Sequence, residues 1–374
     1  MSIGLFWASL YLYVPVLPIH VENITGNLEI VGIILSAYAI AQLTLRIPIG
    51  LLADKIGKKK LSLIAIFLSS AGAVLLMFSN TGITLFLSRT LTGLAAAGWV
   101  PISVLYSSYF KDDNADRSMS QAVMINSIGL LSSTYFGGLI AENYGIDTVF
   151  IISAIFGVIS GVCMLFSQEP HQVNIKPQKI SLKKIINKRL LGICATGSCL
   201  FYLTFSTIYG FIPIYLTNIG TSETMIGVTI SLSLTASLIG AGSLPKINQL
   251  MNNRKAILFT WILMITTTIF TPIFHTLIII IPLQFIGGFG RGIMTALLMS
   301  LVIKQSNYQN RSTSMGIYQS LYSVGMFLGP FISGIIAGMI GVESIFYFAA
   351  LICFIGMIIG MFITDTLEIN EIRN

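Results

Sequence analysis

Two arginines stand deep inside apolar stretches of this chain, where a charged side chain needs a partner or water. Arg89 lies within the apolar run 82–106 and Arg291 within the run 277–302. A charge at the centre of a bilayer costs at least ~2.5–3.5 kcal/mol on insertion scales. Because the planar guanidinium matches a carboxylate or phosphate, both arginines are candidates for binding an anionic group. For Arg89 a structural bond to carbonyls of the first apolar run is an equal alternative.

Helical spacing places polar and aromatic side chains on the same faces as these arginines. Aromatic groups that carry a polar tip suit a partly apolar ligand. The predicted substrate-binding set draws on four apolar runs and comprises Arg89, Thr92, Trp99, Gln284, Arg291, Trp7, Tyr11, Tyr202 and Tyr209. This set predicts a cavity with two guanidinium groups among aromatic side chains.

Acids are missing from the apolar runs. All 14 Asp and Glu residues lie in polar links or near the ends of runs, so proton coupling would have to use Glu22, Glu142 or Asp54. The four cysteines lie inside apolar runs, at spacings that suit neither a zinc site nor a disulfide framework. No nucleophile–base pair, metal cluster or phosphate-binding glycine loop stands out. The sequence therefore predicts no enzyme, no metal and no cofactor.

The elements that carry these residues follow from composition. Hydrophobic residues make up 55% of the 374 residues and charged residues only 9%, against about 25% in soluble domains. A bilayer core needs ~20 apolar residues per helix. We predict an all-α membrane protein with twelve transmembrane helices near 3–20, 30–50, 61–79, 82–106, 118–141, 146–167, 189–216, 225–245, 256–274, 277–302, 314–339 and 344–364.

Basic residues are distributed unequally between the two sides of these spans. Of the 21 Lys and Arg residues, 18 follow even-numbered spans, and the other three lie within spans. By the positive-inside rule, both termini should be cytoplasmic in a multi-pass protein of the cell membrane or inner membrane. The same distribution argues against a nucleic-acid partner for the +7 charge. No cleavable signal peptide is evident.

The two halves of the chain resemble each other. With a shift of 195 residues, Pro18 falls on Pro213, Gly93 on Gly288 and Arg89 on Gln284. We predict an N-terminal six-helix bundle at 1–167, a cytoplasmic linker at 168–188 with a short amphipathic helix near 181–186, and a C-terminal six-helix bundle at 189–374. Because six spans return the chain to the same side, the repeats are parallel, and substrate is then expected between the halves.

The link between the second and third spans carries the sequence Gly50-Leu-Leu-Ala-Asp54-Lys-Ile-Gly57-Lys-Lys-Lys. It resembles the signature loop of the major facilitator superfamily. The resemblance implies that Asp54 docks near Ser314, at the start of the eleventh span, and closes the cytoplasmic side. Gly50 and Gly57 would permit close helix approach and a tight turn, and Arg46 would brace the loop.

Three further segments fit this resemblance and favour its twelve-helix drug-exporter-like branch. They are Arg89–Ala97, Pro15–Pro18, and the run from Gly325 through Gly329 and Pro330 to Gly334, which is similar to an antiporter motif. In drug exporters that motif usually lies in the fifth span, whereas here it lies in the eleventh. We expect Gly325, Gly329 and Pro330 to form a flexing part of the interface between halves.

These observations predict a secondary-active transporter that moves a small amphipathic organic solute by alternating access, with export as the first choice. It would act as a monomer in the lipid bilayer, with protons as a possible coupling ion. An organic-anion facilitator or exchanger that is not coupled to protons is the alternative, because the spans contain arginines and no acids. A lipid flippase or a non-transporting receptor on the same scaffold stays open.

Overall fold

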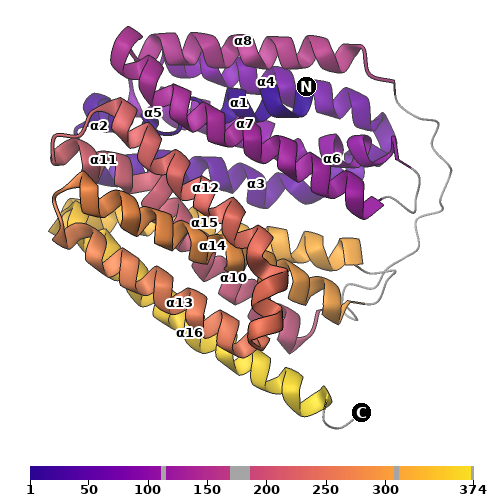
Figure 1. Cartoon of the computed structure of the whole chain (residues 1–374). Coiled ribbons are helices and arrows are strands. Elements are labelled where there is room, and N and C mark those ends of the chain that lie inside the picture. Colours follow the sequence, from indigo (N-terminus) through magenta and orange to yellow (C-terminus); the bar gives the residue numbers. More distant parts are fainter. Residues whose placement is uncertain (111–114, 169–185, 307–310, 372–374) are drawn as a thin grey trace. The chain divides into compact units, whose positions relative to one another are not determined.

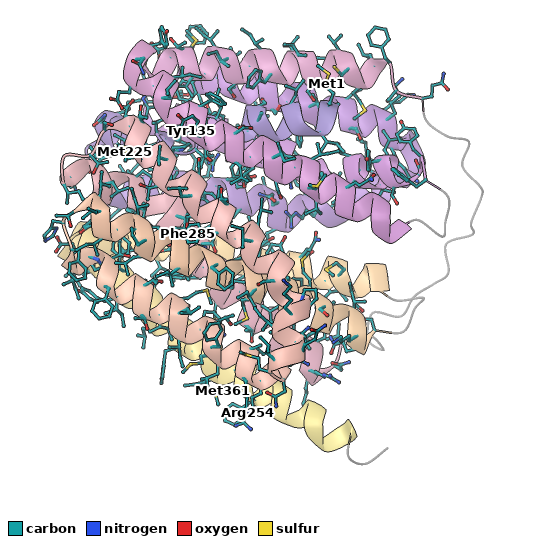
Figure 2. The ribbon with its side chains drawn as sticks, viewed as in Figure 1. Met1, Tyr135, Met225, Arg254, Phe285 and Met361 are labelled. Atoms are coloured by element: carbon teal, nitrogen blue, oxygen red, sulfur yellow. The ribbon has the colours of Figure 1, made fainter. Side chains whose placement is uncertain are left out.

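The chain folds into long apolar helices. The computed structural model describes residues 1–110, 115–168, 186–306 and 311–371, and every regular element in these ranges is helical (Figure 1). Eleven of the described helical segments are long and apolar enough to cross a membrane, and a shorter apolar helix covers Ser2–Tyr11. Apolar side chains such as Tyr135 and Phe285 project from the helix surfaces, as expected where lipid replaces water (Figure 2). The all-α membrane architecture predicted from composition is confirmed.

The contacts divide the chain into two compact units. Unit 1 comprises Met1–Pro177 together with Gly220–Ser231, and unit 2 comprises Gln178–Ile219 together with Leu232–Asn374. The helices of the first stretch are α1 (Ser2–Tyr11), α2 (Leu17–Thr25), α3 (Leu28–Ile56), α4 (Lys58–Met77), α5 (Gly82–Ala97), α6 (Trp99–Ser107), α7 (Ala115–Tyr144) and α8 (Ile146–Leu165).

Unit 2 repeats this order of elements. It is built from α10 (Lys188–Ser206), the π-helix η2 (Thr207–Phe211), α11 (Ile212–Asn218), α12 (Glu223–Leu250), α13 (Asn253–Phe270), the 3-10 helix η3 (Thr271–Ile273), α14 (Leu277–Gln305), α15 (Arg311–Ile340) and α16 (Val342–Glu371). Helix α12 is shared, because its first residues pack in unit 1 and the rest in unit 2. The predicted linker helix near 181–186 lies almost entirely outside the described residues.

The first helix of each half is interrupted at the same place in the repeat. We predicted single spans at 3–20 and 189–216, but a turn at 12–16 separates α1 from α2, and η2 at 207–211 separates α10 from α11. Adding 195 to 12–16 gives 207–211. Proline explains the position, because Pro18 and Pro213 are the second residues of α2 and α11 and lack the N–H that a continuous helix needs.

At the two breaks, some backbone carbonyls lose their usual helical N–H donor and accept a hydrogen bond from another group. Ser153 of α8 donates to the Ser9 carbonyl next to the first break. At the second break the Ile212 N–H donates to the Thr207 carbonyl, five residues back, as in a π-turn. π-turns of this kind are frequent at functional positions in helices.

The predicted span 82–106 is also interrupted, and this feature is not repeated. Helix α5 ends at Ala97 and α6 begins at Trp99, with Gly98 between them. A side chain at Gly98 would overlap the Cβ of Ala65 in α4, so that close packing requires glycine here. The corresponding helix of unit 2, α14, runs without a break from Leu277 to Gln305.

Small residues bring helices together in both units. A Cβ at Gly129 of α7 would lie 2.5 Å from the Gly4 carbonyl oxygen of α1, and one at Gly325 of α15 would overlap the Ser198 carbonyl of α10. Gly129 and Gly325 are equivalent in the repeat. In lipid, where burial of apolar surface does not hold helices together, such close backbone contact supplies the packing energy.

Candidate substrate-binding sites

Arg89 of α5 is buried in unit 1, and none of the described residues is an acidic partner for it. Its side chain is 5% exposed, and its guanidinium carbon lies 4.3 Å from the centre of the Tyr38 ring in α3. Nε and Nη1 make no hydrogen bond within the described part of the chain. A desolvated cation–π contact contributes about 2 kcal/mol, which offsets only part of the cost of burying the charge. Arg89 therefore keeps unused donor capacity.

The Arg89–Tyr38 geometry is set where α5 crosses α3 at a glycine, an arrangement that we call a glycine crossing. A Cβ at Gly93 would overlap the backbone carbonyl of Tyr38, so α5 and α3 touch at this point. Arg89 lies one turn before Gly93 on the same helix, which places the guanidinium over the Tyr38 ring. Thr92 has a different environment, since its hydroxyl donates to the Arg89 carbonyl over 2.9 Å and its methyl group packs at Gly72 of α4.

Aromatic side chains extend from the Arg89–Tyr38 pair. The Tyr11 side chain of α1 lies within interaction range of the Tyr38 hydroxyl. The Tyr11 and Trp7 rings lie 5.6 Å apart, and Trp7 meets Trp99 of α6 edge to face at the same distance. Trp7 is 7% exposed, and its Nε1 has no hydrogen-bond partner among the residues described. We call Trp99, Trp7, Tyr11, Tyr38 and Arg89 the unit 1 row.

Tyr38 of the unit 1 row lies on α3, the helix that also carries the predicted gating residues Arg46, Gly50 and Asp54. Gln42 lies one turn after Tyr38, within interaction range of its hydroxyl, and accepts a hydrogen bond from Arg46 Nη2. Gly57 ends α3 with a φ of 107°, a conformation that favours glycine. The surroundings of Gly50 and Asp54 lie outside what the structure describes, so the predicted contact of Asp54 near Ser314 stays a prediction.

Arg291 of α14 is buried in unit 2 by a different arrangement. It is 7% exposed, and its Nη2 donates to the Ser233 hydroxyl of α12. Ser233 in turn donates to the Gln284 carbonyl over 2.8 Å, and Gln284 Nε2 donates to Thr271 Oγ1 over 3.0 Å. A Cβ at Gly288 would overlap the Ser233 carbonyl. The predicted pair Arg291 and Gln284 thus belongs to one hydrogen-bonded network.

The predicted tyrosines of unit 2 differ in their surroundings. Tyr202 is buried, and its hydroxyl lies 3.3 Å from Ser333 Oγ of α15. Tyr209 lies within η2, and its ring meets that of Phe205 edge to face at 5.2 Å. Its hydroxyl is close enough to Arg291 to interact with the guanidinium charge. Gly325 and Gly329 pack against α10 carbonyls, and Pro330 follows them inside α15. Within unit 2, the two glycines therefore pack along α10, and the predicted flexing role of Gly325, Gly329 and Pro330 stays a prediction.

Tyr38 and Ser233 were absent from the predicted set, although each holds an arginine. A shift of 195 residues aligns them, just as it aligns Gly93 with Gly288. The repeat relates the two positions, but it does not show that either one faces an arginine, which follows from the helix crossings. Within the described residues, no three or more His, Cys, Asp or Glu side chains lie together as a metal site would require.

Comparison with known proteins places this geometry in a family. The family model for the Major Facilitator Superfamily matches residues 1–270 and 194–371. An uncharacterized MFS-type transporter of Methanocaldococcus jannaschii is 24% identical over 355 residues, covering 90% of this chain and 89% of the relative. The multi-drug resistance efflux pump PmrA of Streptococcus pneumoniae is 26% identical over 370 residues, covering 92% and 89%.

A solved structure shares the fold. A bacterial homolog of the human lysosomal transporter Spinster, in an inward-facing and occupied conformation, superposes with a TM-score of 0.84 at 13% identity, covering 98% of this chain and 95% of that one. The family match spans nearly the whole chain, and its members are transporters, not enzymes. The chain therefore belongs to the Major Facilitator Superfamily and is a multi-pass secondary transporter.

Proposed function

We propose that this transporter exports a small amphipathic organic molecule by alternating access. The observation that carries the proposal is the unit 1 row, in which aromatic side chains lead to a buried guanidinium with unused donors. Apolar and polar groups in one continuous row suit a ligand that has both characters. Relatives with about a quarter of their residues identical are named multi-drug efflux pumps, which supports export.

Transport by the purified protein in liposomes tests this proposal. The probes are ethidium, a cationic aromatic, and carboxyfluorescein, an anionic aromatic, each measured with and without a pH gradient. Gradient-dependent movement of either probe supports proton-coupled export. Movement that persists after the gradient is dissipated rules out proton coupling, and absence of movement for a broad panel of amphipathic solutes contradicts the proposal.

An organic-anion facilitator or exchanger is the second candidate, and the charge balance favours it. Arg89 and Arg291 are both buried, and neither forms an ion pair with a carboxylate among the described residues. An anionic solute would supply the missing countercharge. Transport should then be indifferent to a proton gradient and should collapse in Arg291→Ala. Retention of anion transport in that variant would remove Arg291 from the site.

The orientation in the membrane is part of the proposal. The basic links place both termini in the cytoplasm by the positive-inside rule. Single cysteines introduced after Ile56 and after Gly145 should react with a membrane-impermeant thiol reagent from opposite sides of the cell membrane. A flippase would instead move labelled lipid in the same liposomes, and a receptor would bind a probe without moving it.

A further inference from the structure

The strongest unexplained feature of the molecule is the unused donor capacity of Arg89. The side chain is 95% buried, yet Nε and Nη1 find no acceptor in the described parts of the chain. A buried donor that has lost water without gaining a partner costs roughly 1–3 kcal/mol, and more when the group is charged. An anion that reaches these nitrogens supplies the acceptors that the folded chain does not. That penalty would then be relieved on binding and would add to the affinity for an anion.

The neighbouring side chains restrict the charge of such an anion. Arg46, the other interior arginine of unit 1, is already engaged with Gln42. The unit 1 row holds one guanidinium, which matches a singly charged, planar acceptor better than a doubly charged one. A carboxylate has this charge and shape, and its two oxygens match the guanidinium fork.

The neighbouring rings restrict the rest of the ligand. Within the unit 1 row, Tyr11 joins the Arg89–Tyr38 pair to Trp7, and Trp99 lies edge to face beyond it. The Trp7 Nε1 donor also has no hydrogen-bond partner among the described residues of this unit. Indole and phenol rings bind a flat aromatic group by offset stacking or edge contacts.

We infer that unit 1 recognises a carboxylate carried by an aromatic ring, with Arg89 binding the carboxylate, Trp7 and Trp99 contacting the ring, and Tyr38 positioning the guanidinium. The inference rests on the proposed function, since it names the class of solute for the same row. Tyr38 acts through Arg89, because its ring lies 4.3 Å from the guanidinium carbon and supports the guanidinium from one face.

Intrinsic fluorescence of the purified full chain provides a binding test. The chain has three tryptophans, and Trp261→Phe removes the one that lies in unit 2, so the signal comes from Trp7 and Trp99. The probes are benzoate and its neutral analogue benzyl alcohol. We expect saturable quenching by benzoate and at least about tenfold weaker binding of benzyl alcohol, as for the loss of a charged hydrogen bond.

Charge-specific variants separate recognition from structure. Arg89→Gln should weaken benzoate binding at least about tenfold and leave benzyl alcohol unchanged, whereas a purely structural defect would weaken both. Arg89→Lys keeps the positive charge but loses the planar guanidinium, so its affinity for benzoate should lie between those of the parent protein and Arg89→Gln. Arg254→Gln, which removes a guanidinium at the start of α13 in unit 2, is the matched control and should bind like the parent protein (Figure 2).

The role of Tyr38 has its own comparison. Tyr38→Phe keeps the ring under Arg89 and should retain benzoate binding, whereas Tyr38→Leu removes the ring and should lose the preference for benzoate. Equal behaviour of the two variants overturns the positioning role. Equal affinity for benzoate and benzyl alcohol, no saturable quenching, or equal losses for both probes in Arg89→Gln overturns the aromatic-carboxylate site.

The outcome is distinct from that of the transport assay. Charge-selective binding without movement of any solute in liposomes would contradict the proposed function and leave the site standing. Solute export without charge-selective binding would support the proposed function and contradict the aromatic-carboxylate site.

Discussion

Tyr38 and Ser233 occupy equivalent positions in the two repeats, and each contacts an arginine from the fourth helical span of its own half. The Tyr38 ring lies under Arg89, and the Ser233 hydroxyl accepts a hydrogen bond from Arg291. Both contacts lie beside a glycine crossing, at Gly93 and Gly288. One backbone arrangement thus supports a stacked arginine in unit 1 and a hydrogen-bonded arginine in unit 2.

Removal of the Ser233 hydroxyl should destabilise unit 2. Ser233→Ala leaves Arg291 Nη2 without its acceptor, and a charged donor buried without a partner costs about 1–3 kcal/mol. We expect a lower thermal unfolding midpoint of the detergent-purified protein. Ser243→Ala, on the same helix, is the control, because that hydroxyl donates to the Gly240 carbonyl of its own turn. Equal midpoints for the two variants would contradict the network described here.

The glycine crossing in unit 1 should tolerate no side chain. Gly93→Ala places a methyl group on the Tyr38 carbonyl, so α3 and α5 must separate and the Arg89–Tyr38 contact must lengthen. Overpacking of this kind destabilises by about 1–3 kcal/mol. Gly242→Ala on α12 meets nothing within 4 Å, and it should be neutral or stabilising by up to about 1 kcal/mol. Thermal unfolding of both variants measures the difference.

Lys59 should stabilise the end of α8. Its ammonium donates to the Leu165 carbonyl over 2.8 Å and to the Ser167 carbonyl over 2.6 Å, at a helix C-terminus where positive charge is favoured. Lys59→Met should lower stability by about 1 kcal/mol. The exposed Lys60 provides the matched variant Lys60→Met, which should have little effect. A comparable loss in both variants would point to total charge as the cause.

The start of α12 should be open to cross-linking with α7. Thr134 Oγ1 and Ser231 Oγ lie 2.8 Å apart, and Gly138 and Gly227 bring the two backbones close. In a variant without the four native cysteines, Thr134→Cys/Ser231→Cys should form a disulfide under mild oxidation, since the side chains can reach disulfide geometry. Ser132→Cys/Ser231→Cys should not, because residues two apart in a helix, such as 132 and 134 of α7, face different sides.

That disulfide also has an expected effect on transport. Helix α12 belongs to unit 1 at its start and to unit 2 over the rest of its length. A covalent bond to α7 would prevent the start of α12 from leaving unit 1. We therefore expect at least about a tenfold loss of solute movement in liposomes, reversed by a reductant, with alternating access as the reason. Full transport by the oxidised protein would show that this contact stays closed throughout the cycle.

The sequence alone was sufficient for the class of fold and the family. A composition with 55% hydrophobic and 9% charged residues leaves lipid as the only solvent for so much apolar surface, and twenty-residue runs then have to be helices. The Gly50–Lys60 segment carried the family resemblance because a short link between helices depends on local residues. The repeat was visible because glycines and prolines recur at a constant spacing.

The breaks in the first helix of each half were within reach of the sequence but were missed. Pro15, Pro18 and Pro213 stand at motif or repeat positions of the sequence, and their missing N–H groups are sufficient to interrupt a helix. Gly98 was harder to interpret, because its role depends on Ala65 of a different helix.

Tertiary structure was needed for the partners of the buried arginines. Helical periodicity shows which residues of one helix share a face, and it correctly grouped Trp7 with Tyr11 on one helix. It contains no information on which face of α3 meets α5, since that depends on where two helices cross. The crossing at Gly93 selects Tyr38 as the partner of Arg89, and the crossing at Gly288 selects Ser233 as the partner of Arg291.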